Sequence, residues 1–353
     1  MLVFPSAFAS TQALAQSLNK IRGIKVKISL EEDCFLVCST QDPVKLASML
    51  EDTFGIDTIA IARKIIAQFP KVTKEIADVG SRIVMPGEKF FVNVKSDRSD
   101  YVSRDIEFAS TGMLTENLAK IGSYPAKNEQ DADRTILAFI GKKFAYICLQ
   151  VNKGLGGLPL GSLGKIVCSL YDPLSFLSCY MAMKAGFRPE ITLLYVDRGQ
   201  LVENAKLVQI LVEKTGYKDH LLKIAPIQLS GDNAKAAFLK HAIAAKIVIN
   251  QPSNRVSFPF IPEIHPLWFI ESFLQEAILA DKIPYMPLMF LQEKHAYEQV
   301  LKAKQEELAI MTLDKYPRYR AKINNSAKLS IKNMKKLQLH VGPNYLHNIL
   351  DRI

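Results

Sequence analysis

Long apolar runs separated by helical patterns characterise the chain from about residue 162 onward. The runs that we interpret as strands are KIVCSL, ITLLYVD, HLLKIAPI and AKIVINQ, which begin at residues 165, 191, 220 and 245. Unbroken apolar runs of this kind are typical of strands buried in a parallel sheet. Helical patterns such as PLSFLSCYMAMKAG and ENAKLVQILVEKTG lie between them. This alternation predicts a doubly wound α/β domain, whose ligands bind at the carboxyl ends of the strands.

The earlier part of the chain has shorter elements and more turns. Residues 24–40 alternate as two strands around an acidic turn, and Asp42 and Pro43 begin a helical pattern that ends at Gly55. This predicts a compact ferredoxin-like unit that ends near Ile61. A helix over 62–83, the strand KFFVNVKS, another helix and a hairpin around GK (141–142) follow. The fold class is therefore α/β, with an α+β part first.

The composition places the chain among globular proteins. Of its 353 residues, 48% are hydrophobic and 23% charged, which is enough apolar material for packed cores. No apolar run reaches the roughly 18 residues that a membrane-spanning helix needs, so we expect no membrane association. The five cysteines are scattered, which argues against a disulfide framework and favours a reducing compartment, so we expect the cytoplasm.

The charge is concentrated at one end. From Lys315 onward, nine Lys and Arg residues oppose only Asp351, so these 39 residues carry +8 of the formal +10. A basic segment beside a nearly neutral remainder predicts attraction to a polyanion, most simply a nucleic acid. A merely solubilising tail is the alternative.

Three stretches, in order, resemble the 4-thiouridine-forming tRNA sulfurtransferases (ThiI-like proteins). They are LEDTFGIDTIAIARKI, KFFVNVKSDRSDYVSRDIEFASTGMLTEN and VNKGLGGLPLGSLGKIV. The third is the most specific, because it combines many glycines and a proline in the family's junction pattern. The resemblance implies an N-terminal ferredoxin-like domain, an RNA-binding THUMP domain, a PP-loop domain that adenylates a tRNA uridine with ATP, and an unmatched basic tail. Their predicted ranges are 1–61, 62–161, 162–314 and 315–353.

The PP-loop signature of that family, S-G-G-x-D-S, is eroded here. Its glycines let backbone N–H groups converge on a pyrophosphate at a helix N-terminus. In LYDPLSF (170–176) the two glycines fall near Tyr171 and Asp172, Leu174 occupies the aspartate position, and Ser175 matches the final serine. We interpret Asp172 and the following proline as an N-cap and first helical residue rather than as catalytic groups. The degenerate loop comprises Ser169, Tyr171, Asp172 and Ser175.

Other family positions are replaced as well. The second nucleotide loop, T-G-E-x-x-G-Q-V-A-S in the family, corresponds to INQPSNRVSF (249–258), and Met286 stands where a later arginine would be. Sulfur transfer needs a thiolate, yet no cysteine follows Cys179, and we expect all five cysteines to be core residues. The six histidines show no spacing that predicts a shared site, and no metal site is expected.

The basic residues are better retained than the nucleotide loops. Each can contact a phosphate, although a single surface lysine is more often only solvated. The predicted RNA-binding residues are Lys95, Arg98, Arg104, Lys142, Lys143, Lys153, Arg318, Arg320, Lys328, Lys332, Lys335 and Lys336.

We therefore predict a tRNA-binding relative of the thiolation enzymes without adenylation chemistry and without a catalytic residue. An active sulfurtransferase with a divergent loop and a small-ligand-binding module are the alternatives. No cofactor is expected, and ATP with Mg²⁺ would bind only if the divergent loop still functions. The expected partner is tRNA; a homodimer and a separate catalytic or sulfur-donor protein stay open.

Overall fold

The computed structural model describes residues 1–7, 9–19, 27–31, 34–40, 42–96, 103–215, 219–228, 233–262, 265–289 and 316–353. They form two compact units. Unit 1 comprises residues 1–7, 24–52 and 56–155, and unit 2 comprises residues 8–23, 53–55 and 156–353. None of the helices in the described ranges is both long and apolar enough to span a bilayer.

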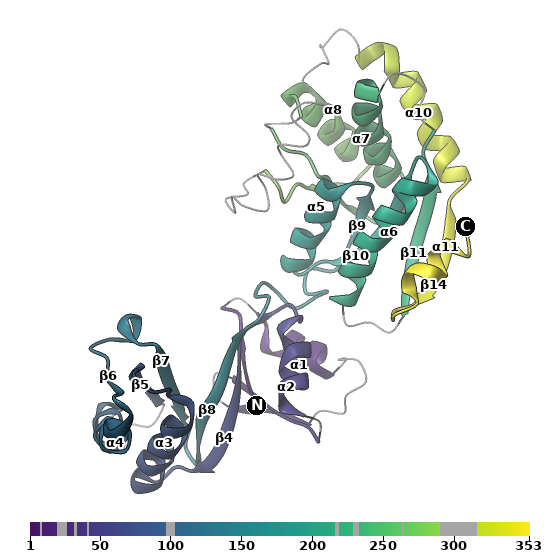
Figure 1. The fold of residues 1–353 in the computed structure, drawn as a ribbon. Coiled ribbons are helices and arrows are strands. Elements are labelled where there is room, and N and C mark those ends of the chain that lie inside the picture. Colours follow the sequence, from purple (N-terminus) through teal and green to yellow (C-terminus); the bar gives the residue numbers. More distant parts are fainter. Residues whose placement is uncertain are drawn as a thin grey trace. The chain divides into compact units, whose positions relative to one another are not determined.

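Unit 1 is built on one eight-stranded sheet with the order β2-β3-β1-β4-β8-β7-β5-β6 (Figure 1). Its strands are β1 (Leu2–Pro5), β2 (Lys27–Glu31), β3 (Cys34–Cys38), β4 (Ile56–Ile66), β5 (Lys89–Ser96), β6 (Tyr124–Pro125), β7 (Arg134–Ile140) and β8 (Phe144–Lys153). Its helices are α2 (Pro43–Glu51), α3 (Phe69–Ile83) and α4 (Ser103–Leu118). The predicted β2–β3 pair, the strand β5 and the β7–β8 hairpin are all present.

The long strand β4 joins the two parts of unit 1. It pairs with β1 on one side and with β8 on the other, so the predicted boundary near Ile61 falls inside a strand. The helix expected over 62–83 is correspondingly shorter, because residues 62–66 continue β4 and α3 begins at Phe69. Pairing with the amphipathic β8 decides the conformation of this segment, where local periodicity alone favoured a helix.

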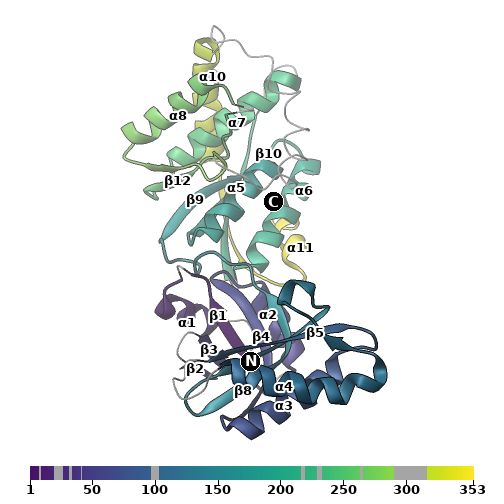
Figure 2. The same cartoon turned by 90° about the vertical axis from the view of Figure 1, so that its left-hand side faces the viewer.

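Unit 2 is the predicted doubly wound domain, with the sheet order β13-β12-β9-β10-β11-β14. Its strands are β9 (Lys165–Leu170), β10 (Arg188–Tyr195), β11 (Asp219–Pro226), β12 (Arg255–Ser257), β13 (Ile283–Tyr285) and β14 (Lys335–His340). Its helices are α1 (Thr11–Asn19), α5 (Pro173–Lys184), α6 (Arg198–Glu213), α7 (Asn233–Ile249), α8 (Leu267–Leu279), α10 (Tyr316–Lys332) and α11 (Tyr345–Leu350). Helices α5, α6 and α11 pack together, and α7 contacts α8 and α10, so helices cover both faces (Figures 1 and 2).

Two expectations about this unit are wrong. The run AKIVINQ is the last part of α7 and the turn after it, not a strand, because its apolar residues continue the buried face of a helix. The segment from residue 315 is not simply a tail: among residues 316–353, α10 packs on α7 and β14 pairs antiparallel with β11. Lys335 and Lys336 lie on the edge strand β14, and Lys322, Lys328 and Lys332 lie on α10.

The glycine-rich junction wraps the carboxyl end of α5. The Leu158 N–H donates to the Lys184 carbonyl oxygen at 2.9 Å, and the Gly161 N–H donates to the Gly186 carbonyl oxygen at 2.9 Å. A Cβ atom on Gly157 would lie 2.2 Å from that same Lys184 oxygen, and its φ is +73°. Neighbouring Gly156 has φ +68° but no atom within 4 Å of a Cβ position.

These two glycines provide a matched pair of substitutions. We expect Gly156→Ala to cost about 1–2 kcal/mol of unfolding free energy, because only the left-handed backbone is disfavoured. Gly157→Ala adds a collision with backbone and should cost roughly 3–5 kcal/mol. Urea unfolding of both variants measures the difference. Equal losses of unfolding free energy would show that the junction backbone shifts without cost to accommodate the Gly157→Ala side chain.

A buried histidine on β11 makes the stability pH-dependent. Burial, and secondarily Arg188, lower the pKa of His220 from 6.5 to about 4. Its Nε2 meets no hydrogen-bond partner among the described residues. Because the unfolded chain binds the proton more readily, stability falls as the pH drops from about 6.5 towards 4.

We expect this histidine to make the protein about 2 kcal/mol less stable at pH 5 than at pH 7.5. Urea unfolding at both pH values measures the effect, and His220→Leu should remove it. The exposed His347 supplies the control, since His347→Gln should leave the pH dependence unchanged. An identical pH dependence in His220→Leu would contradict the assignment.

Candidate functional site

The loop after β9 closes on itself in a capping box. Asp172 is the N-cap of α5, and its Oδ1 accepts the Ser175 N–H at 2.8 Å. In return, Ser175 Oγ accepts the N–H groups of Tyr171 and Asp172 at 2.9 and 3.0 Å. The Ser175 hydroxyl donates to the Asp172 carbonyl oxygen at 2.7 Å. The capping interpretation of Asp172 and Pro173 is confirmed.

Most backbone N–H groups of this loop are missing or already bonded. Pro173, at the first helical position, has no N–H. The Ser175 N–H and the two N–H groups before the helix already have partners within the loop. Asp172 also places a buried carboxyl group at the positive end of the helix dipole, where an anion would otherwise bind.

The glycine-rich junction does not replace the cradle. It contacts the carboxyl end of α5, whereas the loop forms the amino end of the same 12-residue helix. These ends are about 18 Å apart at the helical rise. The junction therefore cannot serve a ligand bound at the Asp172 loop.

The sheet topology locates the place where this fold holds ligands. From β9 the chain proceeds to β10 and β11 on one side, while β12 pairs parallel with β9 on the other. A crevice is expected between the carboxyl ends of β9 and β12, where the direction reverses. The residues that follow these ends are Tyr171 and Phe258.

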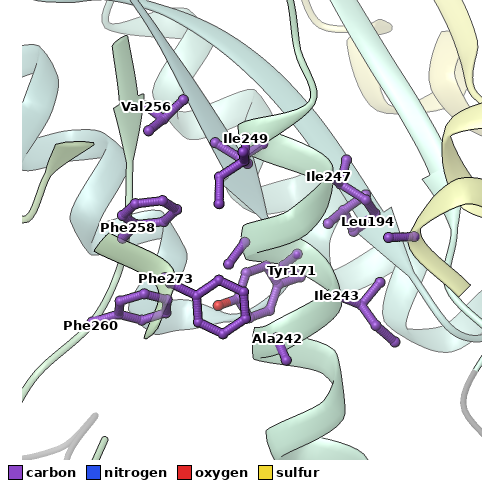
Figure 3. Packing of buried hydrophobic residues seen from close by; sticks show 14 of the residues in the cluster. Tyr171, Leu194, Ala242, Ile243, Ile247, Ile249, Val256, Phe258, Phe260 and Phe273 are labelled. Carbon is purple, nitrogen blue, oxygen red and sulfur yellow. The ribbon is translucent and has the colours of Figure 1, made fainter. Parts of the chain in front are cut away.

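Aromatic side chains of the protein fill this crevice (Figure 3). Tyr171 is 1% exposed, and Phe258 and Phe260 are fully buried. The rings of Phe258 and Phe260 stack with centroids 5.1 Å apart, and Phe260 also meets Phe273 of α8 at 5.9 Å. The segment aligned with the second nucleotide loop therefore supplies core residues.

Two histidines join the same buried cluster. The Tyr171 hydroxyl lies 2.9 Å from Nδ1 of His241, on α7, and Nε2 of His265 lies 3.1 Å from that nitrogen. His241 Nε2 is 3.5 Å from Asp172 Oδ2. Both imidazoles are fully buried. We call Tyr171, Asp172, His241 and His265 the buried polar cluster.

The two imidazoles connect this cluster to the backbone. His265 Nδ1 lies 3.1 Å from the Ile261 nitrogen and 3.3 Å from the Ile261 carbonyl oxygen, and its Nε2 faces His241 Nδ1. Which of these nitrogens carries the proton depends on the tautomer of each ring. Burial, and then the charge of Asp172, raise the pKa of Tyr171 well above its usual value, so it remains a phenol that can donate.

His241 and His265 meet in the core, although their spacing in the sequence predicted no shared site. They are 24 residues apart, one on α7 and one before α8, a spacing that matches no short ligand motif. Only the packing of α7 and α8 beside β9 and β12 brings them together. The signal that could have indicated them is His265 within a largely apolar stretch, 258–270.

Ser169, Met286 and four of the five cysteines are buried or packed against the core. Ser169 is buried within β9 rather than in the loop, and Met286 packs against the apolar core. All five cysteines are free, but the expectation that all are core residues is wrong for Cys38, which is exposed. Burial raises the pKa of Cys148 to about 12. No group of three or more metal-ligating side chains occurs among the described residues.

Comparisons with known proteins agree with this architecture. No protein-family model matches the chain. A probable tRNA sulfurtransferase of Methanosarcina mazei is 30% identical over 168 residues, which is 47% of this chain and 41% of that protein. One from Enterococcus faecalis is 27% identical over 170 residues, with the same shares. The match thus spans less than half of these relatives.

Solved structures extend the likeness over more of the chain. A 4-thiouridine synthetase crystallised as an RNA complex with bound ATP has a TM-score of 0.69, at 16% identity, over 96% of this chain and 98% of that one. This chain has the fold of that synthetase. PH1313 from Pyrococcus horikoshii has a TM-score of 0.64, at 20% identity, over 86% and 98% of the two chains. At these identities the structures establish the fold.

The predicted RNA-binding residues lie in both units. Those with described side chains are all exposed: Lys95, Arg104, Lys142, Lys143 and Lys153 in unit 1, and Lys328, Lys332, Lys335 and Lys336 in unit 2. Arg98 lies outside the described residues. Arg318 and Arg320 are on α10, but their side chains lie outside the described part.

The capping box predicts a specific stability effect. We expect Ser175→Ala to cost about 1–3 kcal/mol of unfolding free energy, because two buried N–H groups lose their acceptor. The control is Ser272→Ala on α8, whose hydroxyl only donates to the Trp268 carbonyl at 2.7 Å, with an expected change within about 0.5 kcal/mol. Urea unfolding compares them, and equal small effects would contradict the role given to Ser175.

Proposed function

We propose that this chain binds tRNA and does not adenylate it. The proposal is carried by the closure of the crevice between β9 and β12, where Tyr171, Phe258 and Phe260 occupy the volume of a ligand. A nucleotide would have to displace a packed aromatic core, and exposing several buried rings costs about 1.5–3 kcal/mol each.

The chemistry of the loop supports the same conclusion. The positions aligned with two family glycines carry a tyrosine ring and a carboxylate, and the helix N-terminus is capped from within. Sulfur transfer through a cysteine of this domain is also disfavoured. A hydrogen bond with Cys168, together with burial, raises the pKa of Cys179, so little thiolate forms at neutral pH.

Support for tRNA as the partner comes from charge and from relatives. Exposed lysines occur on both units, and the relatives are named as tRNA sulfurtransferases. Contacts between lysines and phosphates do not depend on a nucleotide crevice, so they persist when the crevice is filled. We further propose that the protein works in a reducing compartment such as the cytoplasm, which fits its five free thiols.

Calorimetry with Mg-ATP and a tRNA-dependent pyrophosphate assay test the absence of adenylation. We expect no heat of ATP binding at millimolar nucleotide and no pyrophosphate release, because buried aromatic rings lie at the strand ends and the loop N–H groups of Tyr171, Asp172 and Ser175 are already bonded. Micromolar ATP binding with tRNA-dependent pyrophosphate release would identify an active sulfurtransferase and end the proposal.

Filter binding of tRNA across a salt series tests the RNA partner. We expect a steep negative slope of log K against log salt. The double variant Lys142→Gln, Lys143→Gln should reduce the slope by about 1.8, because each lysine–phosphate pair contributes roughly 0.9. The control is Lys206→Gln, an exposed lysine on α6. A wild-type affinity independent of salt would remove RNA as the ligand and favour a small-ligand module.

A further inference from the structure

Helix α10 of unit 2 has one buried side and one exposed side. Three residues of the buried side are at most 3% exposed: Ile323, Ala327 and Ser330. Three lysines lie on the exposed side: Lys322, Lys328 and Lys332. The sequence of the helix, Tyr316–Lys332, contains no Asp or Glu. The charged side chains of α10 are therefore all positive.

A fourth lysine extends this set onto the edge strand β14. Lys336 pairs directly with Lys223 of β11, so their side chains share one face of the sheet. Lys223 Nζ donates to Gln251 Oε1 at 2.9 Å, just after the end of α7. Lys336 therefore lies on the face that carries α7 and α10. We call Lys322, Lys328, Lys332 and Lys336 the α10–β14 lysine row.

Hydrogen bonds attach the backbone under the row to β11. Ser326 Oγ donates to the Gln228 carbonyl oxygen at 2.8 Å, and Ser330 Oγ donates to the Pro226 carbonyl oxygen at 2.7 Å. Strand β14 pairs with β11 along its whole length. Because this backbone is already ordered, a ligand has to immobilise only lysine side chains, which lowers the entropic cost of binding.

The positive charges of the row are not neutralised within the described part of the chain. No ion pair there joins any of the four lysines to a carboxylate, and Asp219 pairs with His340 at the far end of β14. Lys328 and Lys332 are one helical turn apart, where like charges repel by about 0.2–0.5 kcal/mol. Lys322 lies ten residues before Lys332, so the row extends for about 15 Å along α10. Such a row attracts an extended polyanion.

The packing of α10 favours a nucleic acid over a lipid surface. A helix that binds a membrane directs its apolar side towards the lipid. Here Ile323 and Ala327 pack in the apolar core instead. In the described part of residues 322–353, Leu329 is the only exposed large hydrophobic side chain, and 36% of it is exposed. The row therefore offers charge without an apolar group to insert.

The row also has no surface on which unpaired bases could stack. Proteins hold single strands by stacking bases on aromatic rings. Tyr345 is the only Phe, Tyr or Trp among residues 322–353, and it is fully buried. We propose that the α10–β14 lysine row binds the sugar–phosphate backbone of double-stranded RNA without reading its sequence. This inference rests on the proposed function in tRNA binding and assigns a helical arm of the RNA to one edge of unit 2.

Binding of a blunt-ended RNA duplex of about 16 base pairs across a salt series tests the row. We expect the double variant Lys328→Gln, Lys332→Gln to reduce the slope of log K against log salt by about 1.8, since each lysine–phosphate pair contributes roughly 0.9. The matched control is Arg198→Gln, Lys206→Gln, which removes two exposed charges from α6 and should leave the slope unchanged. Equal slopes for the two double variants would overturn the proposal.

Lysine acetylation of the wild-type chain, read by mass spectrometry, keeps the test independent of variant folding. We expect the duplex to block acetylation of the four lysines of the row and to leave Lys206 reactive. An oligouridine of the same length, which forms no duplex, should leave the row reactive.

Two results of this footprint would overturn the assignment to duplex RNA. One is equal protection by the oligouridine, and the other is protection by phosphatidylserine vesicles but not by the duplex. If the row stayed reactive while tRNA still bound with a steep salt slope, the proposed function would stand alone. If no RNA bound the protein, both proposals would fall.

Discussion

The backbone N–H groups at the amino end of α5 are hydrogen-bonded by side chains of the same loop. The rest of the candidate site depends on this constraint. Asp172 and Ser175 exchange hydrogen bonds, and Pro173 removes one donor. A helix N-terminus attracts an anion by at most about 2 kcal/mol. A phosphate placed about 4 Å from the Asp172 carboxylate would be repelled by about 4 kcal/mol at an effective dielectric constant of 20. At that distance the repulsion from an ionised Asp172 exceeds the attraction of the helix N-terminus for a phosphate.

The buried polar cluster links the capped loop to helix α7 and to the start of α8. Asp172 faces His241 of α7, and His241 faces both Tyr171 and His265. Each of these groups is costly to bury without a partner, so the four side chains fix one another's positions. Around them, Phe258, Phe260 and Phe269 exclude water. The hydrogen bonds of the cluster therefore fix how α7 and the start of α8 pack against β9 and β12 within the apolar core.

Local sequence patterns predicted many of the helices and strands of this arrangement, but not which of them contact one another. The bounds of β9 and the start of α5 follow from an apolar run and an Asp-Pro pair. The conformation of AKIVINQ could not be decided from its sequence, because a short apolar run fits a buried strand and a buried helix equally. The pairing of β14 with β11, and of His241 with His265, depends on contacts between residues distant in sequence. Periodicity carries no information about such contacts.

In unit 1, a β-bulge decides which face of the sheet carries the rings of Tyr146 and Phe144. Between Ile61 and Ala62 the β4–β8 register shifts, so that Ala62 faces Cys148. Without the shift, Lys64 would lie opposite Ile147, whose side chain is buried under the helices. The bulge instead places Lys64 opposite Tyr146 and beside Phe144. Because residues alternate between the faces of a strand, the extra residue of β8, Leu149, moves Tyr146 and Phe144 onto the face of β4 that carries Lys64. This basic and aromatic surface is built from unit 1 alone.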